Sequence, residues 1–272
     1  MSRILVVFSS LYGANAELAG MIRPALARSG AEVRLRGVAQ HVLPGQMVAR
    51  AKSAIAVAPA DLEWADGFVL TSQVHSGMIS ASMKAFIDEQ HDAAETGAFL
   101  DRTFTAMATG AYGHAGHEHV VDELNLAGAV WGCVLVPPSG ADAALNHQNG
   151  NPWGLSFGLR HGRIADRQSA AAALQAHLRR FAAVTEVMTD GRAAGISPGV
   201  HPRRRVTAGT DPHRGTGPGH APGDPASAAQ GSTGPGSPSS PRGETGPGSS
   251  GAPSPTNPLR ATDVFGPPRK DR

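Results

Sequence analysis

The apolar residues of this chain come in short continuous runs that alternate with longer segments of helical spacing. The first run, residues 4–8, is β-branched and aromatic, which is typical of a strand buried on both faces of a parallel sheet. Further runs predict strands at 33–38, 67–71, 104–109 and 130–136. Five strands that alternate with helical segments predict a doubly wound parallel α/β sheet.

Four helical segments connect and follow these strands. Leu18, Ile22 and Leu26 recur at helical spacing after the first strand, but Pro24 removes a backbone donor and predicts a bend or an early end there. Ser80 is expected to cap the next helix. Two more helices are expected at 117–126 and from about 166 to 187, whereas residues 39–66 resemble an insertion with one helical turn near residues 62–64.

Composition divides the chain near residue 190. The 82 residues that follow Asp190 hold 15 of the 21 prolines and 16 of the 34 glycines, with a single aromatic side chain. A segment with so little apolar surface does not offset the entropy lost on ordering, so we expect a domain at residues 1–190 and a disordered tail at 191–272.

Charge divides at the same place. Residues 1–190 carry 14 Lys and Arg against 17 Asp and Glu, a net −3, while the tail carries 10 against 5, a net +5. The tail's Arg203–Arg205 run suits an anionic partner, but a solvated tail is the preferred interpretation, and nucleic acid is not expected as a partner.

The single cysteine, Cys133, excludes an internal disulfide and a multi-cysteine metal site built by this chain alone. Neither a signal peptide nor an apolar stretch of 18 residues is apparent, so we expect no membrane span and a cytoplasmic protein.

Three loops are expected at the carboxyl edge of the sheet, where doubly wound folds bind ligands. The first leads from a buried strand into a helix N-terminus, whose free N–H groups suit a phosphate, although a simple capped helix start is an equal alternative. It lacks the Lys of a Walker loop and the Gly-x-Gly-x-x-Gly of a dinucleotide site. The candidate residues are Ser10, Leu11, Tyr12, Gly13, Ala14 and Asn15 in this loop, Ser72, Gln73, Val74, His75, Ser76 and Gly77 in the second, and Thr109, Gly110, Ala111, Tyr112, Gly113 and His114 in the third.

Taken together, the loops resemble the WrbA family of flavodoxin-like NAD(P)H:quinone oxidoreductases, which is related to the NADPH-dependent FMN reductases. The matching segments are Ser10-Leu11-Tyr12-Gly13, residues 74–80 with 83–88, residues 114–118, and Asn151-Pro152-Trp153-Gly154. They occur in the family's order over about 185 residues.

The resemblance implies a five-stranded flavodoxin-like sheet of order 2-1-3-4-5. It also implies a noncovalent FMN whose phosphate is held by residues 10–15 and whose ring lies between residues 72–77 and 109–114. NAD(P)H would deliver hydride to flavin N5, and a quinone or a similar small acceptor would later take it. Relatives form dimers or tetramers, so a homo-oligomer is expected. His75 is the candidate catalytic residue, as a donor to the reduced acceptor, with a histidine that merely packs as the alternative.

Some positions depart from the family pattern. Ser72-Gln73 stand where many relatives have Thr-Pro, and Trp131 aligns with a pocket histidine, which predicts a site that reduces quinones poorly or prefers another acceptor. A metal site is not predicted, because His117 and His119 diverge on a helix. Two alternatives remain: a flavodoxin-type carrier of single electrons, which the modest net −3 disfavours, and a binding module without catalysis.

Overall fold

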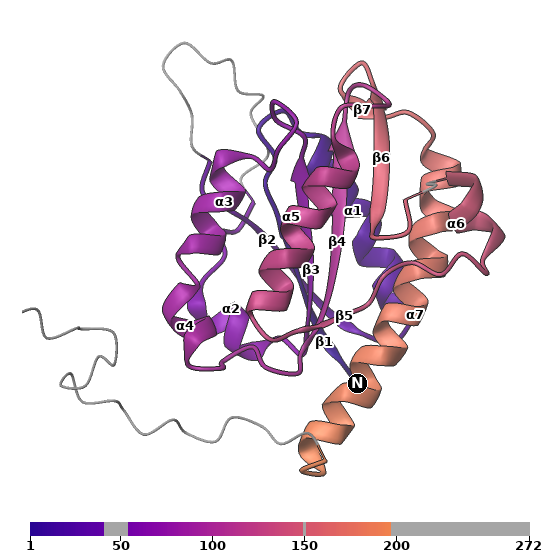
Figure 1. The fold of residues 1–272 in the computed structure, drawn as a ribbon. Helices are drawn as coiled ribbons and strands as arrows, with labels where there is room; N and C mark the ends of the chain where they lie inside the picture. The colour runs from indigo at the N-terminus through magenta and orange to yellow at the C-terminus, as the bar shows by residue number, and fades with distance from the viewer. Residues whose placement is uncertain (41–53, 149–150, 197–272) are drawn as a thin grey trace, which may run out of the picture. The chain divides into compact units, whose positions relative to one another are not determined.

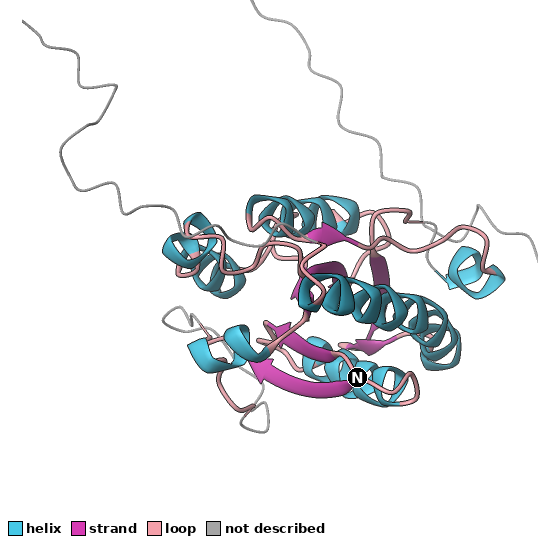
Figure 2. Ribbon diagram, turned by 90° about the horizontal axis from the view of Figure 1, so that it is seen from below, coloured by secondary structure: helices cyan, strands magenta, loops and turns pink. Residues whose placement is uncertain are grey.

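The computed structural model describes residues 1–40, 54–148 and 151–196. In this part of the chain a central sheet lies between helices on both faces (Figures 1 and 2). The strands are β1 (Arg3–Phe8), β2 (Glu32–Gly37), β3 (Gly67–Gln73), β4 (Thr103–Gly110), β5 (Val134–Leu135), β6 (Leu155–Arg160) and β7 (Arg163–Ile164). The helices are α1 (Ala14–Ala27), α2 (Pro59–Trp64), α3 (Ala81–Asp88), α4 (His91–Glu95), α5 (His117–Val130), α6 (Ala143–Gln148) and α7 (Arg167–Ala193).

The strand order is β2-β1-β3-β4-β6-β7, with β5 also paired to β4. Every pair is parallel except β6 with β7. This arrangement confirms the predicted flavodoxin-like, doubly wound sheet, and the first four strands have the predicted order.

The continuous apolar runs exist because both faces of the sheet are buried. In β1, Ile4 and Val6 pack into the core under α1 and α7, whereas Leu5 and Val7 pack into the core under α3 and α5. Successive side chains of a strand point to opposite faces, so a strand between two helical layers needs apolar residues at every position.

The predicted helix cap at Ser80 is confirmed, whereas the early helix end expected at Pro24 is wrong. The Ser80 hydroxyl accepts the Met83 N–H at the start of α3, as expected of a cap. Helix α1, however, runs through Pro24 to Ala27. Pro24 and Gly20 both lie on the exposed face of α1, where water can satisfy the Gly20 carbonyl that the proline leaves unpaired.

The predicted fifth strand at residues 130–136 is present but much shorter than expected. Helix α5 extends to Val130, and only the two residues of β5 pair with the lower half of β4. The C-terminal half of β4, Met107–Gly110, pairs instead with β6, which follows a long connection that contains α6. Two segments, β5 and β6, therefore share the fifth position of the sheet. A search of the sequence for one continuous apolar strand does not find the bounds of either segment.

The predicted tail, residues 191–272, lies outside the described residues from residue 197 onward, as do residues 41–53 of the predicted insertion. Helix α7 continues to Ala193, three residues past the expected domain boundary. Within the described residues, none of the helices has the length and apolar character needed to cross a membrane.

Candidate cofactor-binding site

The three predicted loops meet at the carboxyl ends of the adjacent strands β1, β3 and β4. A buried side chain, Asn15 in the first turn of α1, ties the three strand ends together. Its Nδ2 donates to the Ser9 carbonyl (2.7 Å), while its Oδ1 accepts the hydroxyls of Thr71 (3.1 Å) and Thr109 (3.0 Å). Both acceptor positions of the amide oxygen and one N–H donor of the amide nitrogen are therefore used inside the protein.

The first loop turns into α1 at Gly13, whose φ of 95° is a left-handed conformation that favours glycine. The Ser10 hydroxyl accepts the Ala16 N–H (3.0 Å), and the Glu17 N–H donates to the Gly13 carbonyl. Among the described residues, no hydrogen bond uses the backbone N–H groups of Gly13, Ala14 and Asn15. These N–H groups, at the positive end of a fourteen-residue helix, form a cradle for a phosphate.

The side chains of Ser10 and Asn15 thus have a role that the sequence did not indicate. Both were candidates for contact with the cofactor, yet both hydrogen-bond to the protein and shape the loop. The backbone N–H groups of residues 13–15 remain available to a ligand.

The second loop is a tight hairpin in which His75 and Met78 exchange two backbone hydrogen bonds (2.8 and 3.0 Å). Its central residues, Ser76 (φ 52°) and Gly77 (φ 85°), both have positive φ, as in a type I′ turn. At the end of the loop, the Ile79 N–H donates to the Glu123 carboxylate of α5 (2.7 Å). The hairpin is thereby fixed to the neighbouring helix.

The third loop packs against the second through glycine. A Cβ on Gly116, the N-cap of α5, would lie 2.6 Å from the Gly77 carbonyl oxygen, so only glycine permits this approach. Residues 111–114 are exposed at the edge. Loops two and three therefore form a shared backbone surface on which a flat ligand can lie.

Two buried polar atoms at this edge have no partner among the described residues: Nε2 of Gln73, at the end of β3, and Nε2 of His117, in the first turn of α5. Their residues are only 6% and 4% exposed. Buried polar atoms are nearly always paired, and each exception calls for an explanation. A ligand with several polar atoms explains both, and with the N–H cradle they fit FMN, which carries a phosphate, ribityl hydroxyls and a polar ring.

Among the other predicted residues, Ser72 and Thr109 are fully buried, whereas His75, Tyr12 and Tyr112 lie nearer the rim. His75 is partly buried, and its ring centroid lies 6.5 Å from that of the exposed Tyr12, so the first and second loops touch. Tyr112 is exposed on the third loop. The sequence placed His117 in the family-like segment 114–118 but did not count it among the cofactor-binding candidates. Its place one residue after a glycine that opens a helix was the available signal. In the described chain no three His, Cys, Asp or Glu side chains are grouped so as to hold a metal ion.

Trp131 is a core residue and does not lie at these loops. It follows α5 at the opposite end of the helix from His117, is 3% exposed and packs edge-on against Phe68 and Phe104. Its ring therefore stabilises the core in this chain, and the expectation that it alters the acceptor site has no support from its position.

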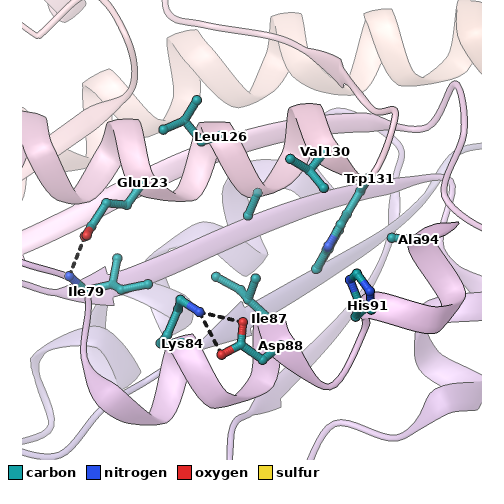
Figure 3. Close-up of a pocket in the computed structure, with 11 residues that line it drawn as sticks. Ile79, Lys84, Ile87, Asp88, His91, Ala94, Glu123, Leu126, Val130 and Trp131 are labelled. Carbon is teal, nitrogen blue, oxygen red and sulfur yellow. Dashed lines mark hydrogen bonds and ion pairs between the residues drawn. The ribbon is translucent and has the colours of Figure 1, made fainter. Parts of the chain in front are cut away.

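A separate groove of about 330 Å³ begins beside the second loop and runs between α3, α4 and α5 (Figure 3). Ile79 and Glu123 lie at one end and Trp131 at the other, with the Lys84–Asp88 ion pair on its α3 side. Leu126 and Val130 on α5 are 66% and 77% exposed. The groove is thus mainly apolar and distinct from the cradle at α1.

Comparison with known proteins agrees with this geometry. Residues 2–146 match the family described as NADPH-dependent FMN reductase. A relative from Deinococcus radiodurans, named NAD(P)H dehydrogenase (quinone), is 33% identical over 163 residues, or 57% of this chain and 82% of the relative. A relative of the same name from Chelativorans sp. is 27% identical over 168 residues, with the same shares. The WrbA-like flavodoxin from Agrobacterium tumefaciens is similar in structure, with a TM-score of 0.46 and 16% identity over 70% of this chain and 99% of that chain.

The family match covers just over half of the chain, including all three loops. It confirms the predicted resemblance and, with it, the oxidoreductase class, the FMN cofactor and the NAD(P)H co-substrate. The chain belongs to the NADPH-dependent FMN reductase family.

Proposed function

We propose that the protein is a cytoplasmic, FMN-dependent NAD(P)H oxidoreductase that transfers two electrons to quinones or similar small acceptors. The observation that carries the proposal is the cradle of three unpaired N–H groups at the N-terminus of α1, placed where the loops of β1, β3 and β4 meet. The quinone acceptor is supported by the names of the Deinococcus and Chelativorans relatives.

Bound FMN supplies the redox chemistry, since it accepts hydride from NAD(P)H and passes two electrons to the acceptor. The chain itself binds and orients. The N–H groups of Gly13, Ala14 and Asn15 would hold the phosphate, and the Asn15 side chain keeps that loop in register with β3 and β4. The paired glycines of loops two and three, Gly77 and Gly116, let their backbones come close to the ring.

His75 and Tyr12 would form the entrance to the site. Because their rings lie close together at the rim, an acceptor that reaches the flavin must pass them. The His75 imidazole would donate a hydrogen bond to the acceptor oxygen that gains charge on reduction. Tyr112 on the opposite loop would cover the other side of the entrance.

A single preparation tests the function against its two alternatives. The protein is purified, mixed with FMN, desalted, and its visible spectrum recorded before and after addition of NADH or NADPH, with and without benzoquinone. Free FMN at equal concentration serves as the control for uncatalysed reduction. Bleaching by the nicotinamide and recovery with quinone is the expected result. A stable one-electron spectrum without nicotinamide oxidation indicates a carrier, and loss of all flavin on desalting contradicts both FMN functions.

We also propose that the protein forms a homo-oligomer through the groove of Figure 3. The support is the apolar lining together with exposed Leu126 and Val130, which a partner surface would remove from water. Sedimentation velocity tests this proposal. A monomer at all concentrations contradicts it, and Leu126→Glu is expected to shift an oligomer toward monomer, while Ile196→Glu, at an exposed residue beyond α7, is the control.

A further inference from the structure

Gln73 is the last residue of β3, and its side chain is buried although the amide nitrogen has no partner among the described residues. Leaving a buried N–H donor unpaired is costly, because the group loses its bonds to water and gains none in exchange. Proteins keep such groups rarely, and often where a ligand completes the bond.

The alternation of β3 gives the face on which this amide lies. The Thr71 hydroxyl bonds to Asn15 of α1, and the Ser72 hydroxyl accepts the Ser80 N–H on the α3 side. Side chains alternate along a strand, so Gln73 projects on the same face as Thr71, one position nearer the carboxyl edge. That is the face on which the first loop turns into α1.

The register of the sheet leads to the same place. Gln73 pairs with Thr109 of β4, whose hydroxyl also donates to Asn15. Thr71, Thr109 and Asn15 thus satisfy one another beneath the loop. Gln73 is the next polar side chain toward the carboxyl edge of the sheet. Its Nε2 donor takes no part in this network and has no partner among the described residues.

We propose that the Gln73 amide donates a hydrogen bond to the ribityl–phosphate chain of bound FMN and contributes directly to the affinity for the cofactor. This inference rests on the proposed function, because it takes FMN as the ligand. A neutral amide donor suits both acceptors of this chain, the ribityl hydroxyls and the phosphate oxygens. The face that Gln73 shares with Thr71, whose hydroxyl bonds to the first turn of α1, favours the chain of the cofactor over its ring.

The test measures dissociation constants by the quenching of flavin fluorescence, for FMN and for riboflavin, which lacks the phosphate. Gln73→Leu keeps a similar volume without the donor and is expected to raise the Kd for FMN about tenfold. Gln73→Glu keeps the shape but presents only acceptors, and is expected to raise it further because of repulsion from the phosphate. Gln90→Leu, which removes an amide bonded to the Phe86 carbonyl at the end of α3, is the matched control.

The two flavins distinguish the acceptors. A loss for FMN alone identifies the phosphate, and an equal loss for both flavins identifies the ribityl hydroxyls; both support the proposal. Urea unfolding of the apoprotein provides a second readout, in which the midpoint of Gln73→Leu is expected to stay equal or rise, since an unpaired buried amide is removed.

Wild-type protein that binds FMN while Gln73→Leu binds it within twofold would overturn the role of Gln73 and leave the proposed function standing. A lower urea midpoint together with an unchanged Kd would show that the amide is structural, and would overturn it as well. Wild-type protein that binds neither flavin would overturn the proposed function and this inference together.

Discussion

Replacing Asn15 with alanine tests whether the phosphate loop is held by its own side chains. The substitution leaves three buried groups without their partner: the Ser9 carbonyl and the hydroxyls of Thr71 and Thr109. Each buried polar group left unpaired costs about 1–3 kcal/mol. Because the two hydroxyls can turn toward other acceptors in part, we expect a total loss of about 3–5 kcal/mol for the apoprotein.

Urea unfolding of the apoprotein, followed by circular dichroism, measures this loss. With a denaturant slope of about 1–3 kcal/mol per molar, the midpoint is expected to fall by about 1–5 M while the slope stays constant. The variant Asn15→Leu with Thr71→Val and Thr109→Val removes the hydroxyl partners together with the amide, so it is expected to recover much of the loss. Replacing both partners of a buried hydrogen bond is less costly than removing one.

FMN affinity separates this account from direct phosphate binding by the Asn15 side chain. If the side chain holds the loop, Asn15→Ala lowers both the apoprotein's stability and its affinity for FMN. A variant that weakens FMN binding but unfolds within about 0.5 kcal/mol of wild type would refute the reasoning. In that case the amide contacts the ligand, as the sequence alone first suggested.

Three further predictions concern single positions. Gly13→Ala places a side chain at φ 95° and is expected to weaken FMN binding by about 1–2 kcal/mol in a fluorescence titration, whereas Gly20→Ala, on the exposed face of α1, should leave the Kd unchanged. Gly154→Ala would place a Cβ 2.5 Å from the Ala106 carbonyl oxygen, so the entry to β6 must shift, and a thermal melt should show a lower Tm than for Gly158→Ala, where the space is open. Burial, reinforced by the charge of Arg180, lowers the pKa of His177 from 6.5 to about 4. Between these pH values the His177 side chain is protonated in the unfolded chain but neutral in the folded chain. Stability is therefore expected to fall by about 3 kcal/mol as the pH drops from about 7 to 4, and parallel pH profiles for wild type and His177→Leu would contradict this.

The parts of the fold that the sequence predicted are those with continuous or periodic apolar patterns. The run at residues 4–8 reads as a buried strand because its side chains enter two cores. Ser80 reads as a cap because its hydroxyl accepts a backbone N–H of the first helical turn. In both cases the structure favoured by the local sequence is also the one that the folded protein requires, and such segments can be predicted from sequence.

The fifth strand could not be predicted in the same way. The residues from Val130 to Val136 are apolar because they end α5, fill the core with Trp131 and supply the two residues of β5. Of the two strands that share the fifth position, β6 is the longer partner of β4. Its residues Leu155 and Phe157 are fully buried and alternate with less buried residues. That alternation is present in the sequence. The long connection between β5 and β6 gives no sign, however, that both segments pair with the same strand.

The three loops predicted from the sequence meet at one edge of the sheet, but the sequence did not predict which of their groups hydrogen-bond within the protein. Polar residues near a strand end all look like ligand contacts when only their order is known. Asn15 and Ser10 hydrogen-bond within the protein, whereas the main-chain N–H groups of residues 13–15 have no partner in the described chain, a difference that no residue type reveals. At the end of β3 and the start of α5, Gln73 and His117 each have a buried side-chain nitrogen without a partner among the described residues.

This difference makes two kinds of variant separable by experiment. A residue that builds the loop, such as Asn15, changes apoprotein stability and FMN affinity together, because the free energy lost from the loop must be restored when the ligand binds. Replacing a residue whose N–H donor bonds only to the ligand, as proposed for Gln73, lowers the affinity for FMN but does not make the apoprotein less stable. Comparing the change in binding free energy with the change in unfolding free energy for both residues therefore tests the whole account of the site, and the same ratio of the two changes in both variants would contradict it.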